Sequence, residues 1–179
     1  NWSRPKEEVD ALMGLFVQAI SEETDELLKN NVRLRAIGDI SSLPKNVQEK
    51  FLWSIDKLNS CTGLTLVIAI SYSSKWEIIE AVRQIAEQVK IGKIQPSEID
   101  NSLMECYLNT SEMPDPELLI RTSGECRISN FLLWQIAYSE LYFTPKLWPD
   151  FRKEDLFEAI YDFQNRERRF GKTSQQLIS

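Results

Sequence analysis

The chain has 179 residues, of which 42% are hydrophobic and 27% are charged, and this is enough to build one sizeable hydrophobic core. We therefore expect a single domain over residues 1–179. A net charge of -6 argues against a general nucleic-acid-binding surface, because such surfaces usually carry net positive charge. The chain contains no histidine, which excludes His-based catalysis and His-ligated metal sites.

Cysteine usage and hydropathy favour a reducing compartment. Cys61, Cys106 and Cys126 are odd in number and lack the spacing of metal-binding or CxxC motifs. No apolar run approaches the roughly 20 residues that span a bilayer, and no signal-peptide pattern precedes the first helix. We therefore expect a cytoplasmic protein with unpaired thiols.

Hydrophobic periodicity predicts alternating helices and strands in the first part of the chain. Apolar residues at helical spacing predict a helix from Pro5 to about Asn30, and period-two alternation predicts a strand over Val32–Ile37. A second helix is expected over residues 44–60. The continuous apolar run Leu64–Ile70 then predicts a strand buried on both faces, as in a parallel sheet covered by helices.

The second part of the chain continues this alternation with shorter elements. We expect helices over residues 75–91, 97–108, 130–136 and 153–169, and strands over residues 117–120 and 139–143. The whole pattern predicts an α/β fold with a central, mostly parallel sheet covered by helices.

One segment, Ile120–Phe131, has the composition of an anion-binding site, and we name it the anion clamp. Arg121 and Arg127 bracket a turn, and Ser129 stands where the next helix is expected to begin. Arginine donates two parallel hydrogen bonds to phosphate oxygens and stays charged. Helix N-termini also present unpaired N–H groups to anions. The segment therefore predicts an anion site built from side chains and backbone.

A structural interpretation of the same residues is equally compatible with the spacing. Ser129 could simply cap the helix, while both arginines pair with Glu117, Glu125 or Glu140. Ion pairs of this kind are common, so the spacing leaves both interpretations open.

Longer stretches of the chain match a known family. Leu118–Phe143, followed by Leu147–Phe151, closely resembles the C-terminal signature of the cis-prenyltransferases, and within that family it looks most like the bacterial undecaprenyl diphosphate synthases. Asn1–Pro5 resembles the end of the family's Asn-Trp-x-Arg-Pro motif, and the likeness extends through Val32–Arg35. The resemblance therefore covers essentially the whole chain.

The resemblance implies that the protein lengthens an isoprenoid chain. The family condenses isopentenyl diphosphate with an allylic diphosphate such as farnesyl diphosphate, giving long-chain cis-polyprenyl diphosphates. Undecaprenyl diphosphate, a lipid-carrier precursor for cell-wall synthesis, is the product this likeness favours. It also implies Mg²⁺ as cofactor, a homodimer, and peripheral contact with the inner face of the plasma membrane through the product. A short-chain cis-prenyl diphosphate synthase and a non-catalytic diphosphate-binding subunit are the alternatives.

The resemblance also implies roles for individual residues. Arg121, Arg127 and Ser129 match positions that bind the diphosphate of isopentenyl diphosphate, and Glu140 matches a carboxylate that helps to bind Mg²⁺.

Other matched positions lie near the start of the chain. Asn1 and Trp2 match catalytic-site positions beside the allylic substrate, and Arg4 matches a substrate-binding position. The product tunnel implied by the family would be walled by three apolar residues, Leu12, Phe16 and Leu64.

The chain also departs from the family pattern. Family members begin with a further segment that holds the catalytic Asp in an Asp-Gly-Asn-Gly-Arg-Trp motif, and this sequence does not contain that motif. We therefore expect the family fold without its N-terminal strand and helix, and no turnover by the 179 residues alone. Ser123 and Cys126 stand where bacterial members often have Gly and a His or similar polar residue, which leaves the role of Cys126 open.

Overall fold

The computed structural model describes residues 5–167. The chain forms two compact units, Asn1–Ser111 and Glu112–Ser179. The single domain expected over residues 1–179 stays a prediction, and each unit is considered by itself below.

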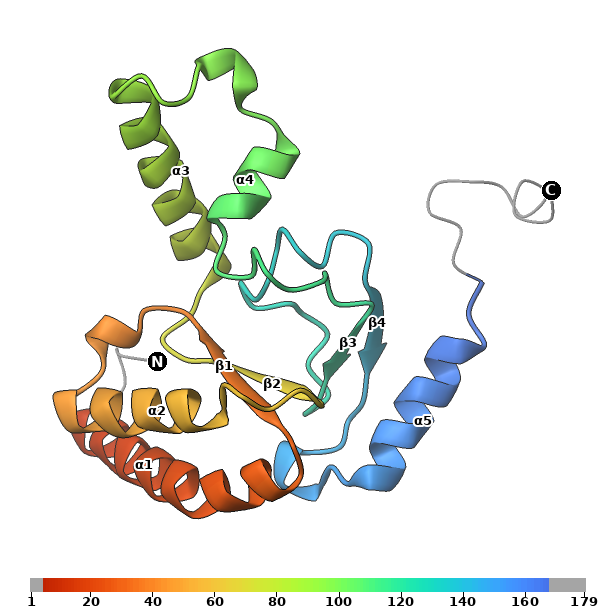
Figure 1. Cartoon of the computed structure of the whole chain (residues 1–179). Coiled ribbons are helices and arrows are strands. Elements are labelled where there is room, and N and C mark those ends of the chain that lie inside the picture. The colour runs from red at the N-terminus through yellow and green to blue at the C-terminus, as the bar shows by residue number, and fades with distance from the viewer. Residues whose placement is uncertain (1–4, 168–179) are drawn as a thin grey trace. The chain divides into compact units, whose positions relative to one another are not determined.

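The first unit is built on a parallel pair of strands, β1 (Arg33–Ile37) and β2 (Thr65–Ala69), joined through α2 (Lys45–Leu58). The long helix α1 (Lys6–Lys29) runs alongside α2 (Figure 1). Phe16 of α1 and Phe51 of α2 meet edge to face, with ring centroids 5.1 Å apart. These helices cover β1 with a core of five buried residues: Ile20, Leu34, Phe51, Leu58 and Cys61. Burial of this apolar surface holds the three elements together.

Two further helices, α3 (Ser74–Lys90) and α4 (Asn101–Tyr107), complete the first unit. Ser73 caps α3 by accepting a hydrogen bond from the N–H of Trp76, and Asp100 caps α4 by accepting one from the N–H of Leu103. These caps satisfy backbone donors that the first helical turn leaves unpaired.

A buried polar network joins these helices to the carboxyl ends of β1 and β2. The fully buried carboxylate of Glu77 accepts hydrogen bonds from the Tyr72 hydroxyl at 2.5 Å and from the Asn109 N–H at 2.8 Å. The Asn109 side chain in turn accepts from the Gly38 N–H at 2.8 Å. One carboxylate therefore links the segments that follow β1, β2 and α4.

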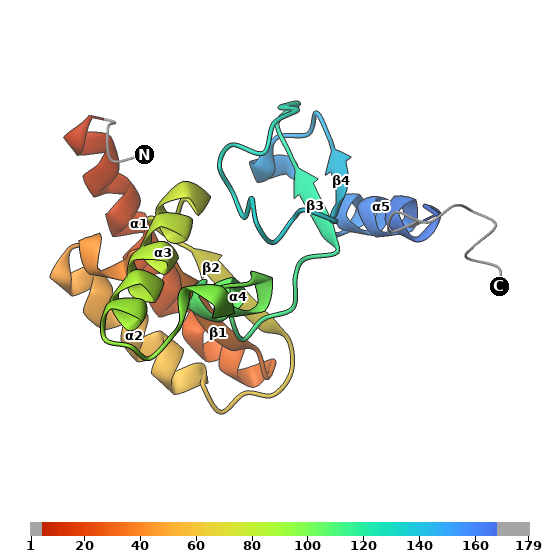
Figure 2. The ribbon, with the colours of Figure 1, turned by 90° about the horizontal axis from the view of Figure 1, so that it is seen from above.

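The second unit contains another parallel pair, β3 (Leu118–Arg121) and β4 (Glu140–Phe143), in register from Leu118↔Glu140 to Arg121↔Phe143. The helix α5 (Lys153–Gln164) runs beside β4 (Figure 2). A short 3-10 turn, η3 (Trp148–Asp150), precedes α5. Residues 122–139, which connect the two strands, form turns and bends instead of the helix that usually joins parallel strands.

These elements confirm the α/β class and the parallel pairing of the strands. The helix expected over residues 130–136 is wrong. Ser129, Asn130 and Leu132 have positive φ angles of 55°, 61° and 48°, which interrupt the right-handed helical path. A hydrogen bond from the Ile136 N–H to the Leu132 carbonyl retains one helical turn.

Two smaller expectations are also corrected. The strand Leu64–Ile70 is not buried on both faces, since Leu64 and Leu66 are 72% and 40% exposed. Within residues 5–167, β2 pairs with β1 alone. The last helix ends at Gln164, before the expected Arg169, because Asn165 caps it; Arg169 itself lies outside the described residues. The three cysteines are free thiols, as expected.

Candidate functional site

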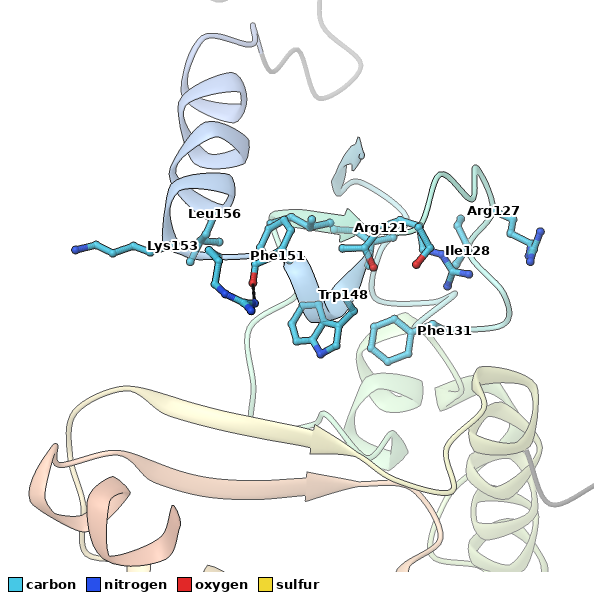
Figure 3. Close-up of a pocket in the computed structure, with 13 residues that line it drawn as sticks. Arg121, Arg127, Ile128, Phe131, Trp148, Phe151, Lys153 and Leu156 are labelled. Carbon is cyan, nitrogen blue, oxygen red and sulfur yellow. Dashed lines mark hydrogen bonds between the residues drawn. The ribbon is translucent and has the colours of Figure 1, made fainter. Parts of the chain in front are cut away.

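A pocket of about 870 Å³ opens in the second unit beside the end of β3 (Figure 3). One part of its wall is polar and comes from the anion clamp: Arg121, Thr122, Ser123 and Arg127. The other part is apolar and includes Phe131, Trp148 and Phe151. The pocket therefore combines a cationic, hydroxyl-bearing end with an aromatic wall.

Arg121 ends β3, and its side chain enters the pocket wall. Its Nε is buried, and among the residues that the structure describes it has no hydrogen-bond partner. A buried donor on a charged group without a partner costs free energy, so such a group in a pocket wall indicates an anionic ligand.

The turn after Arg121 is held by the chain that follows β4. Ser123 and Gly124 both have left-handed backbone angles, with φ of 69° and 68°. The Ser123 N–H donates to the Lys146 carbonyl at 2.8 Å, and the Gly124 N–H donates to the Thr144 carbonyl at 2.9 Å. These two amides therefore already donate hydrogen bonds within the protein, and the turn contributes the side-chain hydroxyls of Thr122 and Ser123 to the pocket.

Arg127 differs from Arg121 in its surroundings. Its guanidinium forms an ion pair with Glu125 and its side chain is 63% exposed. In Figure 3 it extends away from the other labelled side chains. The ion pair that the structural interpretation expects is therefore present for Arg127, and this residue also contributes to the pocket wall; its diphosphate-binding role stays a prediction.

Ser129 does not occupy the position expected for it. Because residues 130–137 form turns, no helix N-terminus lies at Ser129 to present N–H groups to an anion. Ser129 is not among the described residues that line the pocket. The diphosphate-binding role implied for Ser129 stays a prediction, and no helix N-terminus supports it at this position.

Glu140 is engaged with Arg166 in this structure. The two side chains are 2.9 Å apart, and Arg166 also donates to the Leu141 carbonyl at 3.0 Å and pairs with Asp162 at 2.5 Å. The hydrogen bond with Glu140 raises the pKa of Arg166 above its ordinary value. Within residues 5–167 no group of three or more His, Cys, Asp or Glu side chains could hold a metal ion.

The remaining predicted residues fall into two groups. Asn1, Trp2 and Arg4 lie outside the described residues. Among the residues predicted for the tunnel wall, Phe16 packs against the core of the first unit, whereas Leu12 and Leu64 are 43% and 72% exposed.

The sequence reasoning missed the apolar wall of the pocket. Trp148 and Phe151 stack with ring centroids 5.9 Å apart and an interplanar angle of 15°. Their only signal was their place in the Leu147–Phe151 block of the family signature. Arg152 and Lys153, at the start of α5, also line the pocket, and no motif in the sequence marked them.

This arrangement suits an amphiphile with an anionic head and a short apolar tail. The cationic end and hydroxyls can bind oxygens, and the aromatic wall can cover hydrocarbon. The volume lies in the range usual for small-molecule sites.

Comparisons with known proteins agree with this chemistry. Residues 1–171 match the Prenyltransf family, whose description is "Putative undecaprenyl diphosphate synthase". An isoprenyl transferase from Porphyromonas gingivalis is 54% identical over 99% of this chain and 70% of its own length. A ditrans,polycis-undecaprenyl-diphosphate synthase ((2E,6E)-farnesyl-diphosphate specific) from Vibrio vulnificus is 49% identical over 99% of this chain and 70% of its own length.

Solved structures give the same result. Lavandulyl diphosphate synthase from Lavandula x intermedia, in complex with dimethylallyl diphosphate, superposes with a TM-score of 0.94 at 38% identity, covering 96% of this chain and 75% of that one. A probable undecaprenyl diphosphate synthase from Campylobacter jejuni superposes with a TM-score of 0.84 at 38% identity, covering 96% of this chain and 78% of that one. The chain therefore belongs to the undecaprenyl diphosphate synthase family of prenyltransferases.

Proposed function

We propose that this protein elongates a prenyl chain with cis geometry, adding isopentenyl diphosphate to farnesyl diphosphate to give undecaprenyl diphosphate. The observation that carries the proposal is the buried Nε of Arg121, which has no hydrogen-bond partner within residues 5–167 and lies at the cationic end of an aromatic pocket. The names of relatives about half identical to this chain support the substrates and the product.

The pocket's contribution to this reaction is to bind and orient the isopentenyl unit. Arg121 holds the diphosphate, and Arg127 joins it by exchanging Glu125 for phosphate oxygens. The apolar wall at Phe131 and Trp148 covers the hydrocarbon end. The double bond of the bound isopentenyl unit attacks the first carbon of the allylic substrate. The C–O bond at that carbon breaks, and the allylic diphosphate leaves with the electron pair. Loss of a proton from the isopentenyl unit restores a double bond in the lengthened chain.

The test of this function is product analysis. The intact protein should convert radiolabelled isopentenyl diphosphate and farnesyl diphosphate to a long polyprenyl diphosphate, identified by chromatography after removal of the phosphates. A short-chain product is the second candidate, supported by the name and the bound dimethylallyl diphosphate of the similar lavandulyl diphosphate synthase. Use of dimethylallyl diphosphate with only short products would establish that candidate, and absence of turnover would favour a non-catalytic subunit.

Magnesium is part of the proposal, with Glu140 as one ligand that becomes available when its ion pair with Arg166 opens. Glu140→Gln should then raise the Mg²⁺ concentration needed for half-maximal activity several-fold, because the variant loses one anionic ligand. Asp162→Asn, which removes the other carboxylate on Arg166, is the matched control. An identical Mg²⁺ titration for wild type and Glu140→Gln would limit Glu140 to its pairing with Arg166.

A homodimer is proposed as the working form, supported by exposed aromatic side chains in the second unit. Trp148, Phe157 and Tyr161 are each more than half exposed, as suits an interface between copies of the chain. Sedimentation equilibrium of the intact protein should give twice the mass of one chain at micromolar concentration. A single-chain mass under those conditions would refute the dimer.

A cytoplasmic location with peripheral contact at the inner face of the plasma membrane, made through the polyprenyl product, completes the proposal. The free thiols fit a reducing compartment. Among the described helices, none is long and apolar enough to cross a membrane. Cell fractionation should place the protein in the cytosolic fraction, with part of it on membranes that hold the product.

A further inference from the structure

Two parts of the pocket wall come from segments far apart in the sequence. One is the anion clamp, and the other is the start of α5, where Arg152, Lys153 and Leu156 line the pocket. Something must hold these two segments at a fixed separation for the pocket to keep its shape.

Lys146 contacts both segments. Its backbone carbonyl accepts the hydrogen bond from Ser123 in the clamp turn, at 2.8 Å. Its side-chain Nζ lies 2.5 Å from Oδ1 of Asp155, in the first turn of α5. A single residue therefore connects the turn beside Arg121 to the helix that forms the opposite part of the wall.

Asp155 is built into the start of α5 as well. Its second oxygen, Oδ2, accepts a hydrogen bond from the Arg152 N–H at 2.7 Å, and its side chain is only 15% exposed. Both carboxylate oxygens are thus used, one on the helix and one on Lys146. The carboxylate is therefore held by two contacts and is mostly buried, which distinguishes this pair from a fully exposed one.

The clamp turn depends on such support. A residue other than glycine in the left-handed region is strained, because its Cβ lies too close to the following carbonyl oxygen, and Ser123 is in that region. The turn keeps this conformation because neighbouring carbonyls, including that of Lys146, hold its amides.

The pair is charged across the neutral range. The hydrogen bond with Lys146 lowers the pKa of Asp155, and the hydrogen bond with Asp155 raises the pKa of Lys146. The stabilisation from Asp155 is therefore present above its unfolded pKa and is lost as pH falls through its lowered folded pKa. The contribution of Lys146 is present below its unfolded pKa and is lost as pH rises through its raised folded pKa.

From these contacts we infer that Lys146 and Asp155 are positioning residues, which set the separation of the two pocket segments and so the fit of isopentenyl diphosphate. The inference rests on the proposed function of the pocket. Neither residue needs to touch the substrate, since Lys146 acts through the Ser123 turn and Asp155 through α5.

The experiment is a set of variants in the intact protein. Lys146→Met should raise the KM for isopentenyl diphosphate about three- to fivefold with kcat changed less than twofold, because a looser pocket weakens binding. Lys146→Arg should restore a KM near that of wild type. Lys57→Met, which removes the 2.6 Å ion pair with Asp25 in the first unit, is the matched control and should leave KM unchanged.

A second variant guards against a simple folding defect. Asp155→Asn keeps an oxygen for the Arg152 N–H but loses the charge, so it should raise KM as much as Lys146→Met does. The double variant should add nothing further, because both substitutions remove one shared interaction. Additive effects on KM would overturn the inference.

Binding of inorganic diphosphate, measured by calorimetry, separates this inference from the proposed function. If the wild type fails to elongate prenyl chains, the function is wrong, but a three- to fivefold weaker diphosphate affinity in Lys146→Met would still support the positioning role. If Arg121→Met weakens diphosphate binding while Lys146→Met leaves both KM and affinity unchanged, the Lys146–Asp155 pair is a surface ion pair without a positioning role.

Discussion

Replacing Arg121 with methionine in the intact protein is expected to lower kcat/KM for isopentenyl diphosphate about a hundredfold. Charge-assisted hydrogen bonds contribute about 1.5–3 kcal/mol each, and a hundredfold loss corresponds to about 2.7 kcal/mol. Methionine retains an unbranched apolar stem, so β3 and its pairing with β4 should be preserved. Steady-state kinetics with radiolabelled isopentenyl diphosphate give the measurement.

The other arginines provide graded comparisons. Arg127→Ala is expected to lower kcat/KM only about tenfold, because Arg127 is exposed and must leave Glu125 before it can bind an anion. Arg83→Met removes an exposed arginine on α3 that pairs with Glu80, and it should have no effect. If Arg121→Met behaves like Arg83→Met, the pocket beside β3 does not hold the diphosphate.

The largest effect on stability is expected at Glu77. Glu77→Leu should lower the free energy of unfolding by about 3–4 kcal/mol. The substitution leaves the Tyr72 hydroxyl and the Asn109 N–H without their buried acceptor, and each such group costs about 1–3 kcal/mol. The segments after β2 and α4 would lose their common anchor at the same time.

Urea unfolding followed by circular dichroism measures this loss. Glu87→Leu changes an exposed glutamate on the same helix that pairs with Lys90, and its effect should stay within about 0.5 kcal/mol of wild type. Tyr72→Phe removes one of the two donors and should cost about 1 kcal/mol. Equal urea midpoints for Glu77→Leu and Glu87→Leu would show that the buried network contributes nothing to stability.

Most regular elements could be predicted because their residues follow local rules. The helical period from Val9 onward produced α1, and the alternation from Val32 produced β1. The run Leu64–Ile70 also gave a strand, but its burial could not be predicted in the same way. Burial depends on which strands pair with β2, and sequence periodicity does not report pairing.

The anion clamp shows the opposite case. Residues 130–136 have a helical pattern, yet left-handed conformations at Ser129 and Asn130 replace the helix start, since tertiary context overrides weak local propensity. Serine and asparagine also favour turns because their side chains bond nearby backbone. The aromatic wall at Trp148 was equally hidden, because contacts between distant segments leave no local period in the sequence.

The connection between β3 and β4 has a consequence for how this protein folds. Residues 122–139 must close as a long irregular loop before the two strands can pair, and loop closure costs entropy that no internal helix offsets. The same loop supplies Thr122, Ser123 and Arg127 to the pocket wall, next to Arg121 at the end of β3. A diphosphate that binds the closed loop therefore shifts the folding equilibrium of the second unit toward the native state, so its apparent melting temperature should depend on ligand concentration.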